Sequence, residues 1–232
     1  DFDKVKKWYD GYLLNGYQVY NPKAVVSVMT KGKFRSYWSE TGSYEVIVPL
    51  ICMNYDGLKN AIIEMLSGSE VKVDTATFKN DPAKIQNRDD VLTYLIHLGY
   101  LGYDFSYKEV FIPNSEVRGE YINAVAASQW GEVSKALKNS SDTLQAIWQK
   151  YPEKVAEGIE QAHFETAHIQ YNDENALSCV ISLAYYSAQK NYTLHREMPA
   201  GKGFADIVFE PNRNCNLPAL IVELKWGHSA EE

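Results

Sequence analysis

The chain has 232 residues, with 45% hydrophobic and 23% charged side chains and a formal net charge of −7. This composition is typical of a globular protein of one or two domains with a sizeable core, and it excludes an intrinsically disordered chain. The negative net charge argues against a protein that holds nucleic acid non-specifically through a positive surface. It does not exclude a local basic patch.

The sequence contains no targeting or membrane signal. No run of about 18 apolar residues could span a bilayer, and no apolar stretch follows a basic start, as it would in a signal peptide. The three cysteines (Cys52, Cys179 and Cys215) are too few for a disulfide framework and lack Cys-x-x-Cys spacing. We therefore expect a reducing, cytoplasmic location and no membrane partner.

The N-terminal part predicts short helices separated by turns. Turn-forming Gly, Asn, Asp and Pro pairs are frequent before residue 40. Between Pro22 and Gly32, apolar residues recur at helical spacing, which predicts a short helix. Residues 43–66 are also expected to be helical, with interruptions near Pro49 and near Gly57. The chain should therefore begin with an irregular α-rich region.

Residues 88–127 predict a helix, a β-hairpin and a second helix, in that order. Asp89 and Asp90 suit the entry of the first helix, and Gly99 suits its end. Two strand-like runs flank the turn at residues 106–108. This order is typical of the end of a winged helix, but a small α/β packing module without a binding function explains it equally well. Acidic residues surround the turn, so a recognition surface here is not obviously basic.

Residues 128–170 are expected to be helical throughout, in three pieces. Apolar residues mark one helix near Val133 and another near Ile147, and Pro152 suits the first position of a third. The sequence shows no internal repeat and no low-complexity segment. We place a domain boundary between residues 150 and 151.

The C-terminal part predicts one helix followed by three strands. The helix has Asp173 as its cap and an apolar face that extends to Ala188. The strands are expected at residues 192–198, 205–209 and 219–226, and a glycine-containing turn joins the first two.

The last two predicted strands carry charged residues. Glu223 and Lys225 are two residues apart in a strand, so their side chains share a face. If the hairpin is symmetric about the bond between Asn214 and Cys215, Asp206 lies opposite Glu223. The neighbouring residues are apolar, which predicts that these carboxylates are at least partly buried.

Two carboxylates that face each other in a sheet repel, so a positive group is expected beside them. A hard divalent cation such as Mg²⁺ or Mn²⁺ prefers oxygen ligands and carries waters that can attack a phosphate. Lys225 would orient or deprotonate such a water and stabilise charge on the phosphate. The alternative is a plain ion pair in which Lys225 neutralises Glu223 without catalysis, and this is the usual explanation of an isolated Glu-x-Lys.

These residues resemble the motifs of the PD-(D/E)XK nuclease superfamily. The matching segments are Gly-Phe-Ala-Asp206 and, after a short loop, Ile-Val-Glu223-Leu-Lys225. By position, the resemblance implies that Asp206 and Glu223 bind the metal and that Lys225 is the catalytic lysine. It also implies that Glu174, in the first turn of the preceding helix, is an acid beside the metal. Charge pairing with the helix N-terminus is an equal alternative for Glu174.

More narrowly, three segments are similar to the nuclease-like C-terminal domain of a bacterial AAA-ATPase-like family; they begin at Tyr171, Arg196 and Pro218. Near the start, Trp8-Tyr-Asp-Gly-Tyr is similar to the end of that family's ATPase part. The nucleotide-binding half has no counterpart here, because Gly201-Lys202-Gly203 lacks the P-loop spacing. We expect no ATP hydrolysis by this chain, and we expect that both of its ends are cut.

The expected fold is α/β (α+β): an α-rich, winged-helix-like region followed by a restriction-endonuclease-like α/β core that is truncated. Residues 1–150 would form the end of the AAA-ATPase-like region, and residues 151–232 a PD-(D/E)XK nuclease-like domain that is incomplete at its C-terminus.

The leading functional hypothesis is Mg²⁺- or Mn²⁺-dependent cleavage of phosphodiester bonds in nucleic acid, with DNA expected, by a bacterial cytoplasmic protein. The alternative is a non-catalytic nuclease-fold module that binds or assembles with an ATPase region missing from this chain, and the acidic net charge favours it somewhat. A third hypothesis is a DNA-binding regulator that uses the winged helix. A homo-oligomer is also considered.

Overall fold

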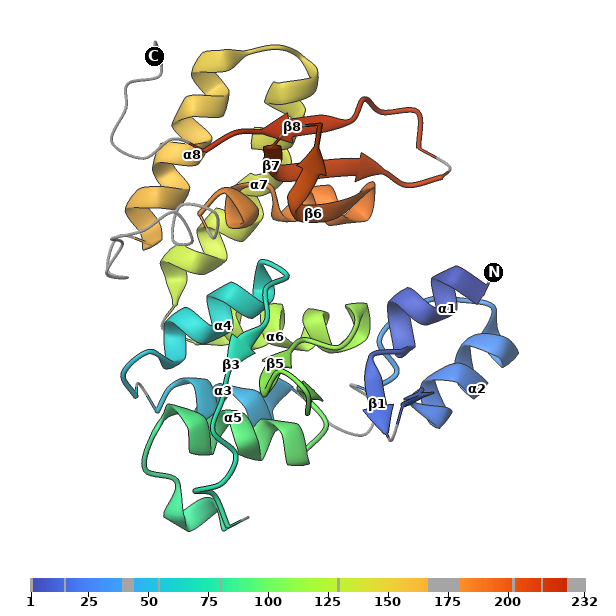
Figure 1. The fold of residues 1–232 in the computed structure, drawn as a ribbon, viewed down its shortest axis with the longest axis vertical. Coiled ribbons are helices and arrows are strands. Elements are labelled where there is room, and N and C mark those ends of the chain that lie inside the picture. Colours follow the sequence, from blue (N-terminus) through green and yellow to red (C-terminus); the bar gives the residue numbers. More distant parts are fainter. Residues whose placement is uncertain are drawn as a thin grey trace. The chain divides into compact units, whose positions relative to one another are not determined.

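The computed structural model describes residues 2–14, 16–38, 44–53, 55–79, 81–128, 130–166, 180–201, 203–213 and 215–224. This part of the chain is mixed α/β, as the sequence predicts, and none of its helices is long and apolar enough to cross a membrane. The chain divides into two compact units, residues 1–131 and residues 132–232 (Figure 1). The predicted boundary at residue 150 lies in a turn between two helices of the second unit.

The first unit begins with a helix, a small hairpin and a second helix. The Asn21 side chain accepts the N–H groups of Lys23 and Ala24, which starts the second helix, and the helix ends where Gly32 adopts a left-handed φ of 65°. The helix predicted between Pro22 and Gly32 is therefore confirmed. The elements are α1 (Phe2–Tyr9), the antiparallel strands β1 (Tyr12–Leu14) and β2 (Tyr17–Val19), and α2 (Pro22–Lys31).

Gly57 separates two of the next helices. Its φ of 73° is readily adopted by glycine, so the predicted interruption is confirmed here. Pro49 itself interrupts nothing, because it is the third residue of a helix, where a backbone N–H has no intrahelical partner. The elements are a 3-10 helix (Tyr44–Val46), α3 (Ile47–Ile51) and α4 (Leu58–Leu66).

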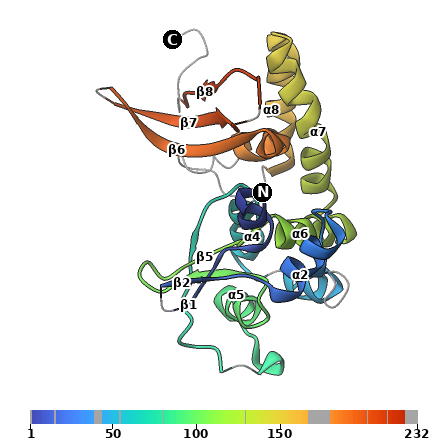
Figure 2. The same ribbon diagram turned by 90° about the vertical axis from the view of Figure 1, so that its right-hand side faces the viewer.

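The predicted helix, hairpin and helix are confirmed. Asp89 and Asp90 lie in the first helical turn instead of at the N-cap, because the Asn87 side chain caps the helix and accepts the N–H of Asp90 at 2.9 Å. A third strand joins the hairpin in an antiparallel sheet of order β3-β5-β4 (Figure 2). The elements are β3 (Val71–Lys72), a 3-10 helix (Pro82–Lys84), α5 (Arg88–His97), β4 (Gly102–Asp104), β5 (Glu109–Phe111) and α6 (Ser115–Ala127).

Two buried carboxylates on α6 hold the segment that follows α2. Glu116 Oε1 accepts the backbone N–H groups of Tyr37 at 2.5 Å and Trp38 at 2.8 Å, and Glu120 Oε1 accepts the Ser36 hydroxyl at 2.9 Å. Both side chains are 1% exposed, and the second oxygen of each has no hydrogen-bond partner among the described residues. Burial raises the pKa of Glu116 despite the two backbone N–H groups, and the charge of Glu120 adds to the increase.

This raised pKa predicts a pH-dependent stability. The folded protein binds the Glu116 proton more tightly than the unfolded chain, so the free energy of unfolding falls as the pH rises from 4.5 through the higher folded-state pKa. Glu116→Gln keeps an acceptor for the Tyr37 and Trp38 N–H groups and cannot ionise. We expect it to remove a slope of up to about 1.4 kcal/mol per pH unit in urea unfolding between about pH 4 and pH 8.

The control for this measurement is Glu160→Gln, which changes an exposed glutamate of the second unit. It should leave the pH dependence of unfolding unchanged. An unchanged slope in Glu116→Gln would show that Glu116 stays ionised in the folded state.

The second unit opens with a helical hairpin. Two helices predicted near Val133 and Ile147 form one continuous helix, and the start at Pro152 is confirmed. The run of Asn, Ser and Asp in the middle is intrinsically weak in helices. In this run the Ser140 hydroxyl donates to Leu137 O, and Ser187 donates to the Ser140 hydroxyl through its N–H and to Ser140 O through its hydroxyl, so the polar groups of buried Ser140 have partners. The helices are α7 (Gly131–Trp148) and α8 (Pro152–Thr166).

The two helices approach closely at Gly158. A Cβ at this position would collide with Thr143 Oγ1 and crowd the Thr143 Cγ2 and Cβ atoms. Thr143 is 4% exposed and therefore has little room to move. The absence of a side chain at Gly158 is thus a packing requirement of the α7–α8 crossing.

Gly158→Ala should destabilise the chain by about 1–3 kcal/mol through overpacking, although alanine favours helices more than glycine. The double variant with Thr143→Ala removes the colliding atoms, so the penalty of Gly158→Ala should shrink in that background. Chemical unfolding of the four proteins measures this coupling. Additive effects of the two substitutions would contradict the proposed contact.

The second unit ends in a three-stranded antiparallel sheet of order β6-β7-β8. The strands predicted at residues 192–198 and 205–209 and the turn at Gly201, which has a φ of 64°, are confirmed. The strand predicted at residues 219–226 is shorter, because residues 219, 223 and 224 are not in a strand and residues 225 and 226 lie outside the described residues. Residues 180–184 are helical, and the predicted start of this helix at Asp173 lies outside the described residues. The elements are a 3-10 helix (Tyr186–Lys190), β6 (Tyr192–Ala200), β7 (Gly203–Pro211) and β8 (Leu220–Val222).

Candidate functional site

The β7–β8 hairpin has the register that the sequence predicts. The pairs are Ile207 with Val222, Val208 with Ile221 and Phe209 with Leu220, so the hairpin is symmetric about the bond between residues 214 and 215. The next pair in this register is Asp206 and Glu223, one residue beyond the end of β8.

Alternating burial along β7 decides the face on which Asp206 lies. Ala205, Ile207 and Phe209 are buried, whereas Asp206 and Val208 are half-buried. The Phe209 ring packs edge-on against Tyr185 and Tyr192, at centroid distances of 5.6 Å and 6.2 Å. Because successive side chains of a strand point to opposite faces, this core contact directs Asp206 to the other face.

The Asp206 carboxylate reaches the end of β8. Its Oδ2 atom accepts the backbone N–H of Leu224 at 2.5 Å, and Oδ1 has no hydrogen-bond partner among the described residues. The predicted partial burial is confirmed for Asp206, which is half-buried, but it is wrong for Glu223, which lies beyond the end of β8 and is exposed. The structure therefore brings Asp206 beside the Glu223–Leu224 backbone. Lys225 and Glu174 lie outside the described residues.

The donor chemistry of this site fits a hard divalent cation. Asp206 offers the carboxylate oxygen Oδ1, and Glu223 offers a second carboxylate from the paired position. Within the described stretches, no three His, Cys, Asp or Glu side chains gather closely enough to hold a metal. The described residues thus include two carboxylates, Asp206 and Glu223, near this strand end, and these two alone do not make a metal site.

Residues of β6 next to the site have other roles. Arg196 lies opposite Ile207, and its guanidinium donates to the Ser182 hydroxyl at 2.8 Å. His195 is hydrogen-bonded to Glu210 at 2.8 Å, four residues along β7 from Asp206. These contacts attach β6 to its neighbours and give His195 a partner outside the candidate site.

Glu197, on β6, is a weaker candidate than Glu174 for the further acid that the resemblance implies, and its backbone has a conformation that the sequence did not predict. Its φ of 48° is left-handed, which is rare for a non-glycine residue in a strand. The β6–β7 pairing is recorded on either side of it, at Arg196–Ile207 and Met198–Ala205, but not at Glu197 itself. The distortion thus lies directly across the sheet from Asp206. No sequence signal identifies it, since glutamate has no preference for this conformation.

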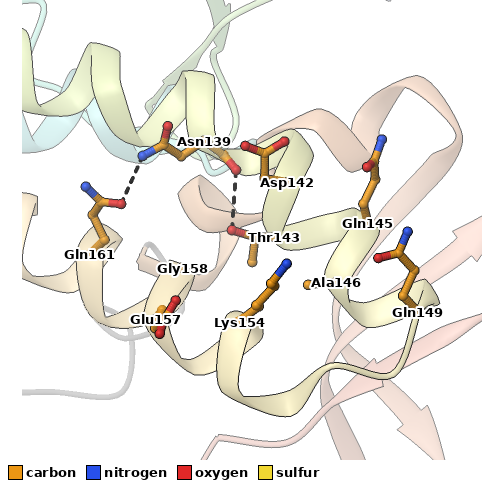
Figure 3. A pocket seen from close by; sticks show the side chains of 10 residues that line it. All are labelled: Asn139, Asp142, Thr143, Gln145, Ala146, Gln149, Lys154, Glu157, Gly158 and Gln161. Atoms are coloured by element: carbon orange, nitrogen blue, oxygen red, sulfur yellow. Dashed lines mark hydrogen bonds between the residues drawn. The ribbon is translucent and has the colours of Figure 1, made fainter.

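A separate cavity of about 420 Å³ lies between α7 and α8 (Figure 3). The Asn139 amide donates to Gln161 Oε1 at 2.9 Å across it. Asp142, Lys154 and Glu157 line it but are exposed. Because solvent already reaches these groups, we interpret the cavity as a hydrated groove of the helical hairpin.

Comparison with known proteins gives one short match. The chain is similar to an uncharacterized protein in the vnfD 5′ region of Azotobacter chroococcum mcd 1, with 41% identity over 51 residues. The match spans 22% of this chain and 10% of that protein, so the chain covers about a tenth of its relative. No protein-family model matches the chain. No solved structure matches it either.

The hydrogen bond of Asp206 predicts a local effect on β8. Asp206→Ala leaves the Leu224 N–H without its acceptor, which should cost about 1 kcal/mol and speed hydrogen exchange at the Leu224 amide. Asp206→Asn retains an acceptor and should preserve the protection. Amide exchange measured by NMR tests both variants, with Glu210→Gln on the same strand as the control. Equal exchange at Leu224 in all of them would contradict this contact.

Proposed function

We propose that the second unit carries a PD-(D/E)XK-type nuclease site that cleaves phosphodiester bonds of nucleic acid, with DNA as the expected substrate. The observation that carries the proposal is the β7–β8 register, which, continued one step past Ile207–Val222, sets Asp206 opposite Glu223, two residues before Lys225 in the chain. The order of a helix followed by three antiparallel strands supports a restriction-endonuclease-like core.

Each site residue has a distinct role in this proposal. Asp206 and Glu223 would hold Mg²⁺ or Mn²⁺ through their carboxylates, and the bound ion supplies Lewis acidity and an acidified water. Lys225 orients the attacking water and stabilises negative charge on the phosphate. Glu174 is proposed as a further acid beside the metal. The Leu224 N–H keeps the Asp206 carboxylate in place through Oδ2, which leaves Oδ1 for the ion.

For the first unit we propose a winged-helix fold. A strand (β3), a helix (α5) and a two-stranded hairpin (β4–β5) follow one another, and the first strand pairs with the last in the order β3-β5-β4. A homo-oligomer, a cytoplasmic location and an ATPase region as partner also remain proposals. They rest on the resemblance in the sequence.

Asp206→Asn is the sharpest test of the nuclease proposal, because it keeps the Leu224 contact and removes a negative charge from the metal site. We expect Mn²⁺ binding, measured by calorimetry, to be lost. Nicking of supercoiled plasmid with Mg²⁺ or Mn²⁺ should fall by at least about two orders of magnitude, since a bound ion contributes several kcal/mol of charge stabilisation. Lys225→Ala should also abolish nicking, but with metal binding retained.

Glu210→Gln is the matched control, because it removes an exposed carboxylate from the same strand without touching the site. Metal binding by the wild-type chain without cleavage of any nucleic acid would favour the non-catalytic binding module. Cleavage that survives Asp206→Asn at full rate would overturn the mechanism.

A further inference from the structure

The turn between β4 and β5 presents aromatic side chains to solvent. Phe105 is 77% exposed and Tyr107 is 65% exposed. Tyr103 packs edge-on against Phe105 with ring centroids 4.7 Å apart, which supports the ring in its exposed position. Large apolar side chains that project together from a turn indicate a binding surface more often than isolated ones do.

The turn is rigidly built. Asp104 Oδ1 accepts the backbone N–H groups of Ser106 at 2.7 Å and Tyr107 at 3.1 Å. The Lys72 ammonium donates to Tyr107 O at 2.7 Å from the neighbouring strand, and Lys108 closes the turn with a left-handed φ of 55°. A preorganised turn loses little conformational entropy on binding, so its aromatic side chains can contribute affinity efficiently.

The base of the turn is acidic. Asp104 and Glu109 are directly paired across the β4–β5 hairpin, and Glu70 precedes β3, the strand that pairs with β5 at Glu109. Lys72 is the cation that pairs with Glu109, at 3.0 Å. Burial and these neighbouring carboxylates raise the pKa of Glu70, which means that the cluster disfavours further negative charge. A cationic partner would relieve this repulsion, whereas a phosphate backbone would add to it.

The helix that a winged helix would place in a DNA groove is poorly suited to that task here. Val91, Leu92 and Leu95 of α5 are fully buried. Arg88, at its start, is hydrogen-bonded to Asp89 at 2.8 Å and also donates to Lys72 O. A helix that reads DNA needs exposed polar and basic side chains along one face, and α5 does not provide them.

The β1–β2 hairpin enlarges the exposed apolar surface of the same unit. Leu14 is 65% exposed and Tyr17 is 77% exposed. The Tyr12 hydroxyl donates to Gly99 O at 2.7 Å, which fastens this hairpin close to the entry of β4. Figure 2 shows the tips of both hairpins on one side of the unit.

We propose that the β4–β5 turn and the adjacent β1–β2 hairpin form a docking surface for a basic segment of a partner protein. Phe105 and Tyr107 contact apolar side chains of that segment, and its Lys or Arg residues pair with Glu70, Asp104 and Glu109. The complementarity of charge selects a protein segment over a nucleic acid. This surface belongs to the first unit and is independent of the proposed nuclease site.

The test uses the full chain and a fluorescein-labelled decapeptide of alternating Lys and Leu, followed by fluorescence anisotropy. The double variant Phe105→Ser with Tyr107→Ser should weaken binding about tenfold, because exposed aromatic residues commonly act as hot spots. Glu70→Gln, which removes one negative charge and keeps the size of the side chain, should weaken binding and reduce its dependence on salt. The charge-reversed peptide of alternating Glu and Leu should bind far more weakly.

Tyr151→Ser is the control variant, since it removes an exposed tyrosine of the second unit. It should bind the Lys-Leu peptide as the wild type does. Equal binding by the double variant would overturn the proposal. The proposal would also be overturned if the chain bound a short DNA duplex and the Phe105→Ser, Tyr107→Ser double variant weakened that binding. If sedimentation shows that the wild type is a dimer and that Phe105→Ser is a monomer, the surface binds a second copy of this chain, and the proposed basic partner is wrong.

Discussion

The burial of Ala205, Ile207 and Phe209 on one face of β7 is the constraint on which the second unit depends. These side chains face the core, where Phe209 contacts Tyr185, and they leave Asp206 on the opposite face. A slip of β7 itself by one residue would exchange its two faces and bury the carboxylate without a partner. The hydrophobic pattern therefore positions the candidate site as strictly as any contact made by the acids themselves.

In the first unit, two buried carboxylates of α6 hold the segment after α2 through hydrogen bonds. Glu116 binds two successive backbone N–H groups of the segment after α2, and Glu120 binds the Ser36 hydroxyl. Burying two carboxylates one helical turn apart is costly. The arrangement is tolerated because the backbone N–H groups of Tyr37 and Trp38 would otherwise lie buried without an acceptor.

The two units illustrate that topology and function are separate questions. The order β3-β5-β4 with α5 supports a winged helix, yet α5 is largely buried and the β4–β5 turn combines exposed aromatic rings with carboxylates. The chemistry of that surface favours a basic protein segment over DNA. In the second unit, the proposed function rests on the resemblance of the residue types near the β7 and β8 strands, and the three-stranded sheet by itself does not imply it.

The local sequence pattern was sufficient to predict several helices and strands of both units. Runs of strand-forming residues, turn residues and the position of Pro152 predicted strands β6 and β7, the register of the β7–β8 hairpin and the start of α8. The sequence also determined the helix, hairpin and helix between residues 88 and 127. For these, each residue's preference and the final fold agree.

Tertiary structure decided the features that depend on distant partners. α7 runs unbroken through a segment of weak helix formers, where Ser187, 47 residues further along the chain, hydrogen-bonds to Ser140. Asn87 caps α5 and frees the Asp90 carboxylate for Thr77 and the Gln86 N–H. The burial of Glu116 and the left-handed Glu197 across from Asp206 likewise arise from residues far apart in the chain. Sequence patterns report what a residue prefers locally, whereas its final conformation follows the partners that the fold brings to it.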